Sequence, residues 1–205
     1  MRLILVRHGE TDANREGRIQ GIGNDPLNAT GRSQAAALGE HLETYKLDAV
    51  YSSPLARALE TAEAIARHHN LRPIELKGLQ ELDIGELDGL TGEEVKERHP
   101  DVLEEWMRDV SSLRMPGGES IVELQDRAWA AVQAIAEGHP KGVVVGVSHN
   151  FAIQSILCKA LDLKLDSFRR IRQDLGAISI LELTDRHPIL ITLNDRCHWA
   201  ESRRL

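Results

Sequence analysis

The sequence predicts an α/β protein with three layers, α/β/α, in which helices cover both faces of a mostly parallel central sheet. Two apolar runs carry most of this prediction. Residues 3–6 form a buried strand at the start of the chain, and residues 143–147 form a β-branched run typical of a strand buried on both faces. Both runs end in polar residues, and helical patterns alternate with the strands. We therefore expect ligands to bind beyond the carboxyl ends of the strands.

The segment after the first strand is predicted as a loop followed by a helix, a strand and a second helix. Residues 15–26 contain three glycines and one proline, so this segment is too broken for regular structure and is able to close over a ligand. The helix that follows is capped by Asn28 or Thr30. A short strand over residues 48–51 then leads into two serines, and a helix begins at Pro54, because proline suits the first turn.

The remaining strands are predicted from shorter patterns. Residues 74–76 indicate an edge strand, and residues 79–89 form an acidic loop punctuated by glycines. Near the end of the chain, residues 177–183 and 188–193 indicate two strands that are joined by a turn and close the sheet.

The alternation of strands and helices is interrupted after the acidic loop. One helix begins at Thr91, a second follows Pro100, and a long helix is capped by Ser120, with no strand pattern between them. We interpret residues 84–118 as a helical insertion that folds over the strand ends. Four of its side chains either face a substrate or pack the insertion onto the body: Trp106, Met107, Arg114 and Met115.

The totals are those of an ordinary globular protein. A chain of 205 residues, 41% of them hydrophobic and 28% charged, is expected to form a single domain over residues 1–205. The net charge of −7 disfavours nucleic acid and anionic membranes as partners, because both reward basic surfaces. Aromatic residues make up only 3%, which also argues against a surface for stacking bases.

Location and redox state are predicted from what the sequence lacks. It contains no apolar run of about 20 residues and no secretory signal pattern at its start, so we expect no membrane segment and a cytoplasmic location. Cys158 and Cys197 have neither metal-binding nor redox spacing, and free thiols in a reducing compartment are expected.

Four residues are candidates for chemistry because of where they stand. Arg7 and His8 follow the first strand, and His149 follows the strand over residues 143–147, where a helix starts at once. Arg57 lies in the first turns of its helix, off the apolar stripe. A cation is misplaced at this positive end of a helix unless an anion binds there, although a solvated arginine paired with a nearby glutamate explains it as well.

In this order and context the motifs resemble those of the histidine phosphatase superfamily, which has the phosphoglycerate mutase-like fold. The resemblance covers essentially the whole chain, and the motifs are highly specific in combination. They are Leu5-Val6-Arg7-His8-Gly9-Glu10-Thr11 with Asn14, Ser52-Ser53-Pro54-Leu55-Ala56-Arg57-Ala58-Leu59-Glu60-Thr61-Ala62, and Val147-Ser148-His149-Asn150.

The resemblance implies a role for each matching residue. His8 is the nucleophile that becomes phosphorylated, and Glu81 in the acidic loop is the acid that protonates the leaving oxygen. Arg7, Arg57 and His149 bind the phosphoryl group. Further substrate contacts are implied for Asn14 beside the phosphate, for Gln20 and Gly21 in the first loop, and for the backbone N–H of Asn150, which replaces a frequent glycine and alters the size of the pocket.

The chemistry of these side chains suits the implied roles. A neutral imidazole is a good nucleophile toward phosphorus, and neighbouring arginines lower its pKa below about 6.5. Guanidinium groups, a histidine and helix-end N–H groups neutralise a transferring phosphoryl group without a metal, so no metal or other cofactor is expected. A leaving alkoxide needs a proton, from Glu81 or, less favoured, Asp83. Arginines lower the pKa of Glu81, and we hypothesise that burial and the phosphate raise it again.

We therefore expect a metal-independent phosphatase that acts on small phosphorylated metabolites through phospho-His8. The alternative is a cofactor-dependent phosphoglycerate mutase, but mutases of this fold are generally longer, and their acidic loop continues with aromatic residues absent here. A binding module without turnover is disfavoured because every motif residue is present. A metal hydrolase is disfavoured because none of the nine histidines stands at i, i+4 around a glutamate.

The substrate itself is not determined by the sequence. The family resemblance allows sugar phosphates, phosphoglycerates, phosphoserine and a ribazole phosphate, and specificity is expected to reside in the insertion and the first loop. Arg114 either meets a substrate carboxylate or pairs with Glu104 or Glu105. A homodimer is left open.

Overall fold

A mixed six-stranded sheet forms the centre of the molecule. The structure is a computed structural model, and it describes residues 1–111 and 113–199. The described strands are β1 (Arg2–Arg7), β2 (Ala49–Ser52), β3 (Ile74–Glu75), β4 (Val143–Ser148), β5 (Ile178–Glu182) and β6 (Ile189–Asp195). They lie in the order β3-β2-β4-β1-β5-β6, parallel from β3 to β1 and antiparallel through β5 and β6. The predicted mostly parallel sheet is confirmed.

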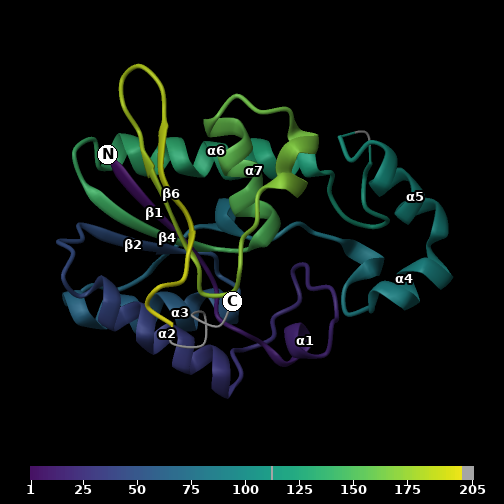
Figure 1. Cartoon of the computed structure of the whole chain (residues 1–205), viewed down its shortest axis with the longest axis horizontal. Helices are drawn as coiled ribbons and strands as arrows, with labels where there is room; N and C mark the ends of the chain where they lie inside the picture. The colour runs from purple at the N-terminus through teal and green to yellow at the C-terminus, as the bar shows by residue number, and fades with distance from the viewer. Residues whose placement is uncertain (112, 200–205) are drawn as a thin grey trace.

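Helices cover both faces of this sheet, which confirms the three-layer prediction (Figure 1). Helices α2 and α3 lie on one face, and α6 and α7 on the other. The described α-helices are α1 (Asp12–Arg15), α2 (Ala29–Leu42), α3 (Ala56–Ala66), α4 (Gly92–Arg98), α5 (Pro100–Arg108), α6 (Ile121–Gly138) and α7 (Asn150–Ala160). Short 3-10 helices are η1 (Arg67–His69), η2 (Lys77–Leu79), η3 (Gly85–Leu87) and η4 (Leu165–Arg170).

The side chains of β1 alternate between two hydrophobic cores. Leu3 and Leu5 pack into the larger core, with α6 and α7, whereas Ile4 and Val6 pack into the smaller core, with α2 and α3. All four side chains are fully buried, which is why this strand reads as a continuous apolar run rather than an alternating one.

The register between β1 and β4 places the two candidate histidines side by side. The strands are parallel, and Arg7 is the partner of Ser148, so that His8 and His149 are the next residues on neighbouring strands. The His8 N–H also donates a hydrogen bond to the Ser148 carbonyl, at 3.1 Å. Both imidazoles therefore leave the sheet at the same edge.

Two helix starts differ from the prediction. Helix α3 begins at Ala56 with Leu55 as its N-cap, two residues after Pro54, so the proline lies in the turn that leads into the helix. Helix α1 lies just before the glycine-rich loop and was not predicted. It is one turn long and is closed by a capping box between Thr11 and Asn14, a signal too short for a periodicity argument.

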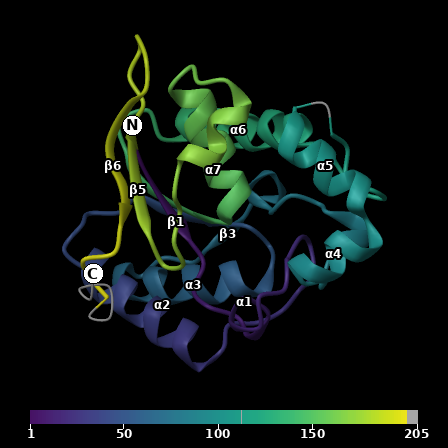
Figure 2. The same cartoon turned by 45° about the vertical axis from the view of Figure 1, so that its right-hand side comes forward.

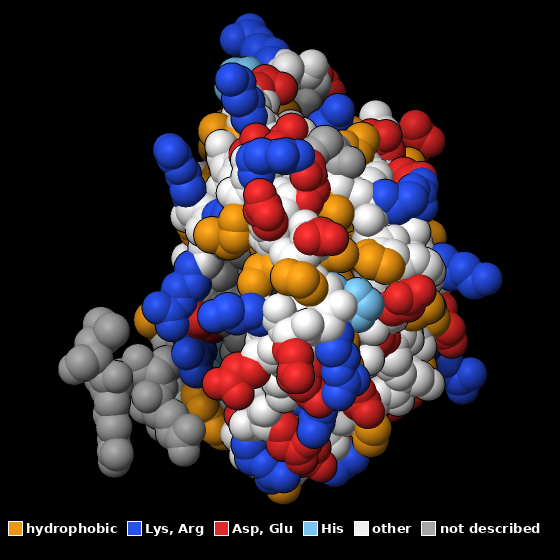
Figure 3. All heavy atoms as spheres, turned by 90° about the vertical axis from the view of Figure 1, so that its right-hand side faces the viewer, with side chains coloured by type: hydrophobic (Ala, Val, Ile, Leu, Met, Phe, Trp, Pro, Cys, Tyr) orange, Lys and Arg blue, Asp and Glu red, His pale blue; other side chains and the backbone are white. Residues whose placement is uncertain are grey.

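Helices α4 and α5 lie at one end of the molecule, beyond the strand ends, as the insertion was expected to do (Figure 2). An isolated bridge between Arg18 and Thr91 joins the first loop to the start of α4. The outer surface at this end carries side chains of both charges, interspersed with hydrophobic ones (Figure 3).

The described residues also bear on two expectations from composition. No helix within residues 1–111 and 113–199 is both long enough and apolar enough to cross a bilayer. Cys158 is buried and Cys197 is exposed, and the two do not form a disulfide with each other.

The loop that follows His8 packs against the first turn of α2 through two glycines. A methyl group on Gly31 would lie 2.1 Å from the Glu10 carbonyl oxygen, and one on Gly9 would lie 2.5 Å from the Gly31 carbonyl oxygen. Backbone atoms of this loop and of the helix therefore approach each other more closely than any side chain allows.

We expect Gly31→Ala to lower the free energy of unfolding by about 1–3 kcal/mol, because the backbone must shift, despite the roughly 1 kcal/mol that alanine adds in a helix. The matched control is Gly138→Ala in α6, since a methyl group there meets no atom within 4 Å. Urea unfolding followed by circular dichroism measures both variants. Equal stabilities of the two variants would contradict the close approach.

Candidate active site

His8 is held as a neutral imidazole with a defined tautomer. Its ring is buried at the end of β1, and Nδ1 lies 2.7 Å from the Gly9 carbonyl oxygen. A carbonyl only accepts, so Nδ1 carries the proton and the lone pair is on Nε2. Burial, and after it the charges of Arg57 and Arg7, keep the pKa of His8 well below its usual value of 6.5. Nε2 is thus unprotonated and able to act as a nucleophile.

Arg57 is fully buried in the first turn of α3 and holds the first loop in place. Its guanidinium donates to the carbonyls of Gly23 and Gly21, at 2.6 and 2.7 Å. Thr61 then connects this helix to the catalytic loop, since its hydroxyl donates to the Arg57 carbonyl and accepts from the Gly9 N–H. The interpretation of Arg57 as a solvated surface arginine is wrong: Glu60 pairs with Arg32 instead.

A second arginine and a second histidine lie close to His8. Arg7 donates to the Gln173 carbonyl at 2.6 Å. The imidazole of His149 is fully buried, and its centroid lies 5.0 Å from that of His8. Its Nε2 is 2.8 Å from the Ser53 hydroxyl, which leaves Nδ1 on the other side of the ring.

Three buried nitrogens around His8 lack a hydrogen-bond partner within the part of the chain that the structure describes. They are Nε of Arg7, Nε of Arg57 and Nδ1 of His149. A buried donor without an acceptor costs about 1–3 kcal/mol, and more when it is charged. Their gathering around one nucleophile therefore indicates a site for an anion with several oxygens.

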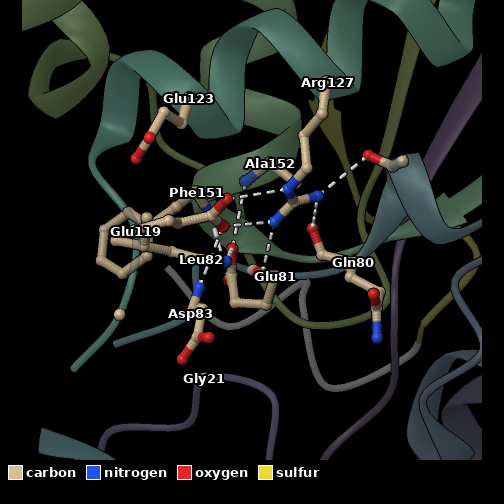
Figure 4. Close-up of polar contacts among 12 residues, drawn as sticks. Gly21, Gln80, Glu81, Leu82, Asp83, Glu119, Glu123, Arg127, Phe151 and Ala152 are labelled. Carbon is tan, nitrogen blue, oxygen red and sulfur yellow. Dashed lines mark hydrogen bonds and ion pairs between the residues drawn. The ribbon is translucent and has the colours of Figure 1, made fainter. Parts of the chain in front are cut away.

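Glu81 binds the first turn of α7 beside this group (Figure 4). Its carboxylate accepts from the N–H groups of Leu82 and Ala152 at one oxygen and from that of Phe151 at the other, at 2.9 to 3.1 Å. Burial, the largest effect, raises the pKa of Glu81, whereas the N–H groups of Leu82 and Phe151 and the two arginines lower it. The N–H groups of Phe151 and Ala152 at the start of α7 thus bind the carboxylate.

The loop that carries Glu81 is held by an ion pair that sequence reasoning missed (Figure 4). Arg127 of α6 donates to the carbonyls of Gly78, Gln80 and Glu81, at 2.7 to 3.1 Å, and it pairs with Glu119. Glu119 in turn accepts from the Asp83 N–H at 3.0 Å. Because two long side chains fix four backbone groups, the carboxylate of Glu81 has little freedom to move.

A cavity of about 170 Å³ unites most of the predicted site residues. Its lining includes seven of them: Arg7, His8, Asn14, Gln20, Arg57, Glu81 and Asn150. His149, which packs against His8, is not among the described lining residues, and the buried Gly21 holds Arg57 rather than lining the cavity. The alternative acid Asp83 is not among the described lining residues, and its carboxylate accepts from the Gly85 N–H.

The insertion residues separate into different roles. Met115 is buried and Trp106 packs on two phenylalanines, whereas Met107 is 66% exposed. Arg114 donates to the Gly118 carbonyl and pairs with Glu123, so its expected pairing with Glu104 or Glu105 is wrong.

Three further residues line the cavity and were missed by sequence reasoning: Arg18, Ile19 and Phe151. Arg18 and Ile19 belong to the loop that was expected to close over a ligand, but nothing in a broken loop tells which side chains point inward. Phe151 fits equally well as a core residue of its helix.

The α/β fold and a buried neutral histidine among buried cations at the strand ends suit an enzyme of phosphoryl transfer. The comparisons with known proteins identify the family. Residues 3–196 match the family model described as "Histidine phosphatase superfamily (branch 1)". The chain therefore belongs to the histidine phosphatase superfamily and is a phosphoric monoester hydrolase of that family.

Relatives resemble the chain over nearly its whole length. "Phosphoserine phosphatase 1" of Hydrogenobacter thermophilus is 33% identical over 98% of this chain and 95% of its own length. "Metal-independent phosphoserine phosphatase" of Arabidopsis thaliana is 34% identical over 97% of this chain and 83% of its own. Among solved structures, Bacillus stearothermophilus YhfR superposes with a TM-score of 0.89 at 31% identity, covering 96% of this chain and 98% of that one.

The lowered pKa of His8 makes folding stability depend on pH. In the unfolded chain His8 binds a proton near pH 6.5, whereas in the folded chain it stays neutral at that pH. The free energy of unfolding therefore falls as pH falls below that value. The slope from one such histidine reaches about 1.4 kcal/mol per pH unit. We expect His8→Gln to reduce this slope, measured by urea unfolding at a series of pH values between about 8 and 5. His187→Gln, at an exposed histidine outside the cavity, is the matched control and is expected to keep the wild-type slope.

Proposed function

We propose that this chain is a metal-independent phosphatase of small phosphomonoesters that works through a phosphohistidine on His8. The observation that carries this proposal is the set of buried nitrogens of Arg7, Arg57 and His149 without partners, gathered around the nucleophile. The phosphoryl oxygens of a substrate are the acceptors that these groups lack. Two guanidinium groups and a histidine then offset the charge that develops during transfer.

In the first step, Nε2 of His8 attacks phosphorus, the new N–P bond forms, and the ester P–O bond breaks. The leaving oxygen takes a proton from Glu81, whose pKa is raised by burial. Nδ1 keeps its proton and donates it in a hydrogen bond to the Gly9 carbonyl, and this bond stabilises the positive charge that the ring gains. The alcohol is released, and Glu81 is left as a carboxylate.

In the second step, the same carboxylate acts as a base. Glu81 accepts a proton from water, the water oxygen attacks phosphorus, and the N–P bond breaks to return a neutral His8 and inorganic phosphate. The three N–H groups that bind Glu81 stabilise the carboxylate during this half of the cycle, as a base requires.

The relatives support hydrolysis over transfer to a second substrate. The two relatives described above carry phosphoserine phosphatase in their names, one of them as metal-independent. Phosphoserine is therefore a substrate to test. The product distinguishes the two alternatives, because a phosphatase releases inorganic phosphate and a mutase forms isomerised phosphoglycerate.

Two further expectations stay proposals. We infer a cytoplasmic location from the composition, and a homodimer is consistent with the edge strand β6, on which Ile189, Ile191 and Leu193 are each more than two-fifths exposed.

The first experiment offers the purified chain a panel of phosphomonoesters in EDTA, including phosphoserine and 3-phosphoglycerate with and without its bisphosphate primer. We expect release of inorganic phosphate that is lost in His8→Ala and retained in His187→Ala. Isomerised phosphoglycerate without phosphate would establish the mutase instead. Hydrolysis that survives in His8→Ala, or that EDTA abolishes, would overturn the proposed mechanism.

A second prediction concerns the proton that Glu81 supplies. We expect Glu81→Gln to lower kcat/KM for an alkyl phosphate by about 100- to 10,000-fold, but to affect p-nitrophenyl phosphate much less, because nitrophenolate leaves without a proton. Arg127→Met is expected to cause a smaller loss with the same dependence on leaving group, since Arg127 acts through Glu81.

The double variant tests this dependence. Adding Arg127→Met to Glu81→Gln is expected to cause no further change in the ratio of kcat/KM between the alkyl phosphate and p-nitrophenyl phosphate. Arg186→Met, at an exposed arginine in the turn before β6, is the matched control and should keep the wild-type ratio. Equal losses for both substrates in Glu81→Gln would show that Glu81 is not the acid.

A further inference from the structure

A second cavity adjoins the catalytic one beneath the inserted helices. It has a volume of about 190 Å³, and all of its lining side chains are apolar. Leu82, Ile84 and Leu87 line it from the loop after Glu81, and Val95 and Val102 from α4 and α5. We call this cavity the apolar chamber.

The apolar chamber and the catalytic cavity share part of their lining. Ile19 and Phe151 line both of them. Glu81 stands at their junction, because Leu82 follows it directly in the chain and the Phe151 N–H donates to its carboxylate at 3.1 Å. An alcohol that leaves at Glu81 is therefore released next to the chamber.

The described lining of the apolar chamber offers no partner for a charged group on the alcohol part of a substrate. The described residues that line the chamber include no cation, and Arg18 is the one cation of the catalytic cavity besides Arg7 and Arg57. Arg18 already pairs with Glu16 and Glu94 and donates to the Gly89 carbonyl at 2.9 Å. A substrate carboxylate in the chamber would lose its water without gaining a partner.

The walls of the chamber are ordered by packing. Trp106, Phe151 and Phe168 make edge-to-face contacts, with ring centroids 5.4 to 5.9 Å apart. Ile19 is held from the other side by backbone hydrogen bonds to Gly89 and Leu90. A dry apolar cavity of about 150 Å³ is large enough to bind benzene, so the chamber accommodates a group of at least that size.

We propose that the apolar chamber binds the alcohol part of the substrate, so that the chain prefers phosphomonoesters of apolar alcohols. This inference rests on the proposed phosphatase function and deepens it. It also separates the chain from what the names of its relatives suggest, because the serine part of phosphoserine carries two charges and no apolar group.

A series of straight-chain alkyl phosphates tests this inference on the unmodified protein. From ethyl to hexyl phosphate the leaving alcohols have nearly equal pKa values, so kcat/KM follows binding of the chain. We expect a rise of about fourfold for each methylene that enters the chamber, and a value for hexyl phosphate well above that for phosphoserine. Binding of the same compounds to His8→Ala, measured by calorimetry, should rise in parallel.

Three variants of α5 test whether the effect arises in the chamber. Val102→Phe fills the space, and the ratio of kcat/KM for hexyl to ethyl phosphate is expected to fall toward one. Met107→Phe introduces the same side chain on the same helix but on its exposed side, and the wild-type ratio should remain. Leu103→Asn, which lines the chamber with an amide, is expected to lower the ratio without adding bulk.

The outcomes separate the two proposals. Hydrolysis that needs His8 but is equally fast for all chain lengths, or fastest for phosphoserine, overturns the chamber inference and leaves the phosphatase intact. A ratio that falls equally in Met107→Phe also overturns it. Absence of hydrolysis for every phosphomonoester overturns the proposed function, and the inference with it.

Discussion

The active site depends on one structural constraint, the parallel pairing of β1 with β4 in a fixed register. Arg7 lies opposite Ser148, so His8 and His149 emerge together at the edge of the sheet although 140 residues separate them in sequence. A shift of one residue would turn the buried side chains of β1 toward the wrong faces. The cores on both sides of the sheet thus stabilise the geometry of the two histidines.

The second constraint is charge. Arg57 is completely buried, and its Nε, like Nε of Arg7 and Nδ1 of His149, has no hydrogen-bond partner among the described residues. Leaving such groups unpaired in the interior costs free energy of folding, so stability alone does not explain them. Glu81, held by three N–H groups, offsets part of this positive charge while remaining at the edge of the cavity. Burial lowers the pKa of His8, with a further contribution from the two arginines, and burial raises the pKa of Glu81 against their effect, which is what a nucleophile and an acid require in one site.

The inserted helices add a different kind of surface. α4 and α5 turn apolar side chains toward the cavity and charged ones toward solvent (Figure 3). The loop over residues 81–87 carries the carboxylate of Glu81 and also supplies apolar side chains to the wall of the apolar chamber. Phe151 lines both cavities. The cavity for phosphoryl transfer and the chamber for the alcohol therefore share part of their lining. The first acts through charge and the second through apolar contact.

The sequence by itself determined the strands, the main helices and the residues proposed for the reaction, because buried strands, helix caps and motif spacing are local signals. His8, Arg57 and His149 were found in this way, and their cavity was expected beyond the strand ends. Only the tertiary structure decided the rest. Arg127 and Glu119 look like surface residues of a helix and its start until they are seen to hold the loop of Glu81, and Ile19 and Phe151 look like core until they are seen between two cavities. The physical reason is that a side chain's partner across the fold, unlike its helix or strand, is set by packing between segments far apart in the chain.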